Sequence, residues 1–261
     1  MITASHKGGF LRVIYGINPV AEALKARPTG IEKLLVSAGR TDKEIGGIMK
    51  AAASSGVRVE TVQPKKLDEV AGTGGHQGVV ACLSGQYPYR GLDEIITNWK
   101  KSGKPALILV LDSIQDPQNL GALIRSAVSA GAHGVVIPKD RACEVTPAVV
   151  KASAGATEHA NCLIAREVNL VRAMEELKRV GVWTAGLDAA CKAAIYDADL
   201  SGDIALVIGS EGAGLRRLVK EACDLCVSIP MQGGFDSLNA SIAGAIALFE
   251  AGRQRRPTKV K

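Results

Sequence analysis

The chain has 261 residues, of which 47% are hydrophobic and only 3% aromatic, and its 32 Lys and Arg outnumber its 26 Asp and Glu. The apolar content suits packed cores and excludes a disordered chain, while no apolar run approaches the roughly 20 residues of a membrane helix. Because the start also lacks a secretory signal pattern, we expect a soluble, cytoplasmic protein without a membrane partner. The net charge of +6 favours a polyanionic partner, and the few aromatic residues argue against base stacking as the main binding mode.

The first third of the chain alternates short helix and strand patterns. Asn18 and Pro19 suit the start of a helix, as a capping residue followed by proline in the first turn. Helices are predicted at 18–26, 42–55 and 64–70, and strands at 31–37, 57–62 and 78–83. We interpret residues 1–83 as a small α/β domain. The Gly, Pro and charged residues of 84–104 break the pattern and predict a linker, with a short helix at 93–100.

Residues 105–261 follow a longer and more regular alternation. Strands are predicted at 106–111, 135–138, 161–165, 182–187, 204–208 and 225–229, and helices at 120–130, 146–154, 167–180, 215–222 and 238–254. Strands that alternate with helices indicate a parallel sheet covered on both faces. Ligands of such sheets bind at the carboxyl ends of the strands, so the loops after Leu111, Ile208 and Ile229 are the candidate sites.

The cysteines give no support for a metal site. They stand at positions 82, 143, 162, 191, 223 and 226. Without an export signal, we expect all six to be reduced thiols, mostly small buried residues. Cys223 and Cys226 form a C-x-x-C pair, but no second pair or spaced Cys/His cluster completes the four ligands of a structural zinc site.

Each of the three loops is ambiguous when considered separately. In the first, Asp116 or Asn119 can cap the following helix, and Arg125 either points to solvent or holds an RNA phosphate. In the second, Gly214 is not followed by Lys and Ser or Thr, which excludes a P-loop, and Arg217 replaces the last glycine of a dinucleotide fingerprint.

The remaining polar residues of these loops also have simple structural explanations. Glu211 in the second loop is a favourable charge beside the start of a helix. In the third loop, Ser237 or Asn239 can cap the last helix. Neither pattern predicts a function until the loops are considered together.

In order, the segments N-L-G-A-L-I-R (119–125), I-G-S-E-G-A-G (208–214) and I-P-M…S-L-N-A-S (229–241) resemble the three motifs of the SpoU (TrmH-like) family of RNA ribose methyltransferases. The resemblance covers residues 106–256, with Ala240 where family members often carry valine. Residues 14–24 and 76–81 are similar to the ends of the L30e-like substrate-binding domain of rRNA-modifying members. The whole chain resembles the branch that methylates guanosine in bacterial 23S rRNA.

The resemblance implies a fold, a cofactor and an assembly. The C-terminal parallel-sheet domain would carry a trefoil knot, which chain topology otherwise avoids. S-adenosylmethionine would bind in the knot, near Gly209, Gly212, Ile229, Met231 and Leu238. The protein would be a homodimer, largely through the knotted region. An apolar stripe on the last helix would then be interfacial, formed by Leu238, Ile242, Ala245, Ile246 and Phe249.

The resemblance also implies a metal-free methyl transfer to a ribose 2′-hydroxyl. Arg125 would contact an RNA phosphate and stabilise the forming alkoxide, because a guanidinium is a poor base. The residues that would position the ribose, Arg125 and the cofactor are Asn119, Glu211, Ser237 and Asn239. The alternatives are a tRNA ribose methyltransferase, a non-catalytic RNA-binding relative, and a nicotinamide enzyme, which the failed fingerprint argues against.

Overall fold

The structure is a computed structural model that describes residues 5–6, 9–40, 42–233 and 237–256. The chain divides into two compact units. The small unit comprises Met1–Pro88 with Val145–Ala160, and the large unit comprises Tyr89–Glu144 with Asn161–Lys261. Neither unit is therefore one continuous stretch of chain.

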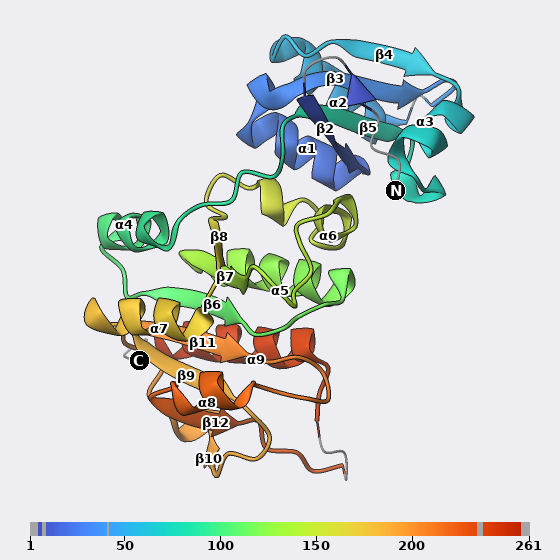
Figure 1. Cartoon of the computed structure of the whole chain (residues 1–261). Coiled ribbons are helices and arrows are strands. Elements are labelled where there is room, and N and C mark those ends of the chain that lie inside the picture. Colours follow the sequence, from blue (N-terminus) through green and yellow to red (C-terminus); the bar gives the residue numbers. More distant parts are fainter. Residues whose placement is uncertain (1–4, 7–8, 41, 234–236, 257–261) are drawn as a thin grey trace, which may run out of the picture. The chain divides into compact units, whose positions relative to one another are not determined.

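The small unit is a mixed α/β structure around a five-stranded sheet, in the order β1-β2-β5-β3-β4 (Figure 1). Only β3 and β4 pair in parallel, and the other neighbours are antiparallel. The strands are β1 (Ser5–His6), β2 (Gly9–Tyr15), β3 (Ile31–Ser37), β4 (Val59–Val62) and β5 (Val79–Ser84), and the helices are α1 (Ile17–Ala26), α2 (Lys43–Ser54) and α3 (Pro64–Ala71). Strands β1 and β2 were not predicted from the sequence.

A segment far along the chain completes the small unit. It contains α6 (Pro147–Ala152) and a 3₁₀ turn (Ala156–Glu158). Glu158 is fully buried and accepts two hydrogen bonds of 2.8 Å from Arg12 of β2. Gly155 has φ +89°, and a Cβ there would lie 2.8 Å from the Cα of Pro19. The sequence pattern predicts this segment as part of the C-terminal domain. In the structure it packs with the small unit, and an ion pair between residues 146 positions apart leaves no local pattern that could reveal this.

The large unit contains the parallel sheet that the sequence predicted. Its seven strands follow the order β10-β12-β9-β11-β6-β7-β8, and each neighbouring pair is parallel. The strands are β6 (Leu107–Leu111), β7 (Gly134–Pro138), β8 (Ile164–Glu167), β9 (Trp183–Leu187), β10 (Ala193–Ala194), β11 (Ile204–Ile208) and β12 (Leu225–Ser228). All five residues of β11 are buried, as expected for a central strand.

Helices cover both faces of this sheet, which confirms the predicted layers. They are α4 (Leu92–Ser102), α5 (Pro117–Ser129), α7 (Leu170–Arg179), α8 (Arg217–Glu221) and α9 (Ala240–Gln254). One core joins α4, α7 and α8 to alternate residues of β6 and β11, such as Ile108 and Val207. On the other face α9 packs on α5 and β11. A Cβ on Gly244 would lie 2.3 Å from the Leu123 side chain, so α9 and α5 approach closely.

The structure corrects the prediction for two cysteines. Cys191 and Cys226 form a disulfide, with Cα atoms 5.6 Å apart, so the expectation of six reduced thiols is wrong for this pair. The pairing of β10 with β12 brings the loop containing Cys191 back beside the strand containing Cys226. The sequence separation of 35 positions hides this proximity from local sequence patterns. Among the helices that the structure describes, none is long and apolar enough to cross a membrane.

Candidate active site

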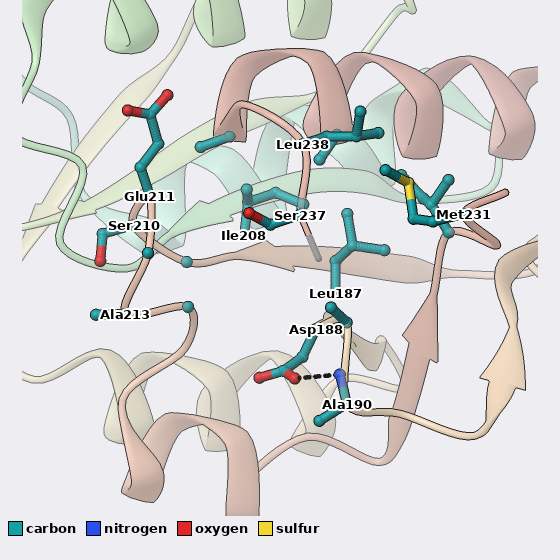
Figure 2. Close-up of a pocket in the computed structure, with 17 residues that line it drawn as sticks. Leu187, Asp188, Ala190, Ile208, Ser210, Glu211, Ala213, Met231, Ser237 and Leu238 are labelled. Atoms are coloured by element: carbon teal, nitrogen blue, oxygen red, sulfur yellow. Dashed lines mark hydrogen bonds between the residues drawn. The ribbon is translucent and has the colours of Figure 1, made fainter. Parts of the chain in front are cut away.

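A pocket of about 330 Å³ opens at the carboxyl edge of the large sheet (Figure 2). Four segments form its wall: 187–190 after β9, 208–214 after β11, residues 229 and 231 after β12, and residues around the start of α9. This location and size suit a small-molecule site of a parallel α/β sheet. All five predicted cofactor-binding residues line this pocket, namely Gly209, Gly212, Ile229, Met231 and Leu238.

The turn after β11 is too tight for a side chain at its first position. A Cβ on Gly209 would lie 2.1 Å from the carbonyl carbon of Gly214 and 2.4 Å from the backbone nitrogen of Leu215. Two hydrogen bonds close the turn, from Ser210 N to Gly214 O at 3.1 Å and from Gly214 N to Ser210 O at 2.9 Å. The glycine therefore permits a close approach of backbone to backbone within the turn.

Three polar side chains meet at the edge of the pocket, from the first turn of α5, the loop after β11 and the N-cap of α9. Asn119 Nδ2 donates to Glu211 Oε1 at 3.1 Å, and Asn239 Nδ2 donates to Asn119 Oδ1 at 2.9 Å. Asn239 Nδ2 also donates to Glu211 Oε1. Of the three, Glu211 lines the pocket itself. Three segments far apart in the sequence are thus brought together, with Asn119 and Glu211 92 positions apart and the two asparagines 120 positions apart.

Helix capping positions two members of this polar cluster. Asp116 accepts hydrogen bonds from the backbone of Gln118 and Asn119 at 3.3 and 3.1 Å, and so fixes the start of α5. Asn239 Oδ1 accepts from the backbone of Ser241 at 2.9 Å and caps α9. Asn239 therefore has both the structural role and the contact with Glu211, so the two interpretations of this residue are compatible.

The pocket has an apolar end and a polar end. Figure 2 shows Leu187, Met231 and Leu238 gathered at one end, with Glu211 and Ser210 at the other. Ser237 also lines the pocket, but no hydrogen bond joins its side chain to the three residues of the polar cluster. Such a pocket suits a ligand with an extended apolar part and a polar or charged part.

Arg125 lies outside both the pocket and the polar cluster. It is exposed on α5, and its side chain has no hydrogen bond or ion pair within the described part of the chain. Six residues of helix separate it from Asn119, which corresponds to about 9 Å along the axis and about a third of a turn around it. The structure therefore leaves this cation free for an external anion.

Sequence reasoning missed two acidic residues of this region. Asp188 lines the pocket after β9, a strand that was predicted but whose loop was not considered. Burial disfavours its charge, but hydrogen bonds from Ala190 N–H and Lys220 outweigh this, so the pKa of Asp188 lies below its ordinary value. Asp112, directly after β6, is fully buried and pairs with Arg216. The rule that ligands lie at strand ends would have found the first, and no sequence signal marks the burial of the second.

No group of three metal-ligating side chains occurs among the residues that the structure describes. The described site therefore consists of the carboxylates of Asp188 and Glu211, the two asparagines bound to Glu211, and the tight turn at Gly209.

Two known protein families together match most of the chain. Residues 106–249 match the SpoU rRNA Methylase family, and residues 13–88 match the RNA 2′-O ribose methyltransferase substrate binding family. This chain belongs to the SpoU rRNA Methylase family. The resemblance drawn from the three loop motifs is therefore confirmed.

Relatives in this SpoU family cover most of the chain. It is 42% identical over 247 residues to the 23S rRNA (guanosine-2′-O-)-methyltransferase RlmB of Coxiella burnetii, spanning 94% of this chain and 96% of the relative. It is 40% identical to the RlmB enzyme of Ralstonia nicotianae, over 96% of this chain and 98% of that one. Among solved structures, the SpoU methyltransferase AviRb of Streptomyces viridochromogenes, in complex with the cofactor AdoMet, is 27% identical with a TM-score of 0.76, covering 94% and 90%.

Proposed function

We propose that this protein transfers a methyl group from S-adenosylmethionine to the 2′-hydroxyl of a guanosine in 23S rRNA. The observation that carries the proposal is the meeting of Asn119, Glu211 and Asn239 at the edge of the pocket, in a chain of the SpoU family. The RlmB relatives at about 40% identity support the substrate. For such a substrate, we propose that the protein acts in the cytoplasm.

The pocket fits the cofactor. S-adenosylmethionine supplies an electrophilic methyl group on a positively charged sulfur. The apolar end formed by Leu187, Met231 and Leu238 suits its adenine ring, and the carboxylates of Asp188 and Glu211 favour its positive charge. The turn of Gly209 and Gly212 and the backbone near Ile229 would hold the cofactor. AdoMet is present in the solved AviRb complex.

The residues around the pocket would act on the ribose. A ribose hydroxyl is a weak acid, so its attack requires a base or stabilisation of the developing negative charge. Arg125, free of partners in the described part of the chain, would hold an RNA phosphate and stabilise the forming alkoxide. The polar cluster and Ser237 would orient the ribose toward the methyl group, which is a contribution of positioning.

We further propose that the chain acts as a homodimer through α9. Ile242 and Phe249 are 52% and 51% exposed, and seven residues of helix place them on one face. Two large apolar side chains exposed on one face of a helix, with the half-buried Ala245 and Ile246 on the same helix, suit a surface for association. The trefoil knot stays a prediction from the family resemblance. The small unit, which matches the substrate-binding family, would select the RNA.

The test is methyl transfer from labelled S-adenosylmethionine to defined RNAs, followed by mapping of the modified nucleotide. We expect label on a guanosine ribose of 23S rRNA and none on tRNA. Asn119→Ala should lower the rate about a hundredfold through misplacement of the ribose. The control is Asn98→Ala, an exposed asparagine on α4 that should change nothing. Label on tRNA alone, on a base, or on no RNA would overturn the proposal.

A further inference from the structure

A buried carboxylate holds one arginine beside the active site. Asp112 follows β6 directly and is fully buried. Its Oδ2 accepts a hydrogen bond from the backbone nitrogen of Arg216 at 2.8 Å, and its Oδ1 accepts from Arg216 Nε at 2.6 Å. Ser113 Oγ donates to the same Oδ1 at 3.2 Å. The side chain and the backbone of Arg216 are thus both fixed by one carboxylate.

This arrangement leaves the outer end of the arginine available. Nε is occupied, but no hydrogen bond joins Nη1 or Nη2 to any residue that the structure describes, and the side chain is 41% exposed. The next residue differs, because Arg217 is bound to Glu221 at 2.9 Å across one helical turn. A guanidinium that is held at Nε and open at its two Nη atoms presents a rigid pair of donors to an anion.

The position of Arg216 indicates which anion it meets. The arginine lies two residues after Gly214, which lines the pocket, but it is not itself part of the pocket wall. Asp112 N donates to Ile208 O at 2.8 Å, so the carboxylate sits at the carboxyl ends of β6 and β11, where the polar cluster also begins. An anion at the Nη atoms therefore lies outside the cofactor pocket, at the same strand ends as the polar cluster.

We propose that Arg216, held by Asp112, binds a backbone phosphate of the RNA close to the nucleotide that is methylated. This inference rests on the proposed function. Arg216 would be a second phosphate contact, distinct from Arg125. Unlike Arg216, Arg125 is not held by any residue that the structure describes. Because Asp112 already orders Arg216, binding requires less loss of side-chain freedom than at an unbraced arginine. A phosphate held there fixes the register of the RNA relative to the pocket.

The test compares Arg216→Ala with Arg217→Ala, its neighbour on the same turn. Affinity for a 23S rRNA fragment is measured between 50 and 300 mM salt, and S-adenosylmethionine affinity by calorimetry. Loss of one charge-assisted phosphate contact should weaken RNA binding at least about tenfold at low salt. It should also reduce the slope of log K against log salt by about 0.7 to 0.9. Cofactor affinity should stay within twofold, and Arg217→Ala should behave like the unmodified protein.

A second variant separates the phosphate contact from folding. Asp112→Asn removes the charge that orders Arg216, so RNA affinity should fall severalfold, and the double variant should bind no more weakly than Arg216→Ala. Additive losses, or equal RNA affinity and salt slope in the two arginine variants, would refute the inference. So would a tenfold loss of cofactor affinity in Arg216→Ala, since that result places the arginine in the pocket. RNA binding is read without methyl transfer, so failure of the proposed reaction remains a separate result.

Discussion

The tight turn at Gly209 gives a direct test of how the pocket is built. In Gly209→Ala, the new methyl group would lie 2.1 and 2.2 Å from the carbonyl carbon and oxygen of Gly214. Because both atoms belong to the backbone, the turn itself must move by more than 1 Å to restore ordinary contact. Overpacking of this kind lowers the free energy of unfolding by about 2 kcal/mol. Displacement of the pocket wall should also weaken S-adenosylmethionine binding at least about tenfold.

Urea denaturation and calorimetry measure the two effects. The matched control is Gly202→Ala in the same unit, where a Cβ would meet nothing within 4 Å. That variant should keep both its stability and its cofactor affinity. If Gly209→Ala binds the cofactor as tightly as Gly202→Ala does, the turn is not part of the binding wall and the reasoning is wrong.

Three further predictions concern charge and assembly. Arg125→Ala should reduce single-turnover methyl transfer about a hundredfold, with unchanged melting temperature and cofactor affinity, and Arg125→Lys should rescue only partly; near-normal turnover would exclude its role. Asp188→Asn should weaken S-adenosylmethionine binding about fivefold, because a carboxylate on the wall of a partly solvated pocket contributes about 1 kcal/mol to the binding of a cation. S-adenosylhomocysteine, which lacks the positive charge on sulfur, should lose less, and equal losses would contradict the electrostatic explanation. Since the pKa of Asp188 is lowered, this contribution is present at neutral pH and is lost only as the pH falls through that lowered value. The double change Ile242→Glu with Phe249→Glu should convert a dimer to monomers in sedimentation, and a persistent dimer would place the interface elsewhere.

Regular periodicity made most of the large unit predictable. The central strand at 204–208 has the predicted bounds, since a continuous apolar run between glycine and polar turns leaves little freedom. The last helix begins at Ala240, although the pattern suggested Leu238. Asn239 caps it, which places Leu238 outside the helix and in the pocket wall.

Site residues that stand in a recognisable motif could be predicted from the sequence. Those whose role depends on a buried tertiary contact could not. Glu211 and Asn239 stand in recognisable loops, so their meeting with Asn119 could be expected before any coordinates. Asp112 lies in the loop after Leu111. Its pairing with Arg216, 104 positions further along the chain, depends on β6 and β11 being neighbours in the sheet. Strand order is a tertiary property that local sequence does not encode.

Residues 145–160 belong to the small unit but lie in the sequence between two segments of the large unit. The two units therefore cannot be exchanged independently during evolution. Any recombination that replaced only the first 88 residues would leave Glu158 buried without Arg12. Breaking a buried ion pair on one side costs about 3 to 5 kcal/mol, a large share of the stability of most domains. A successful exchange of the first 88 residues must therefore bring an arginine at the matching position, or alter the acidic residue in the recipient at the same time.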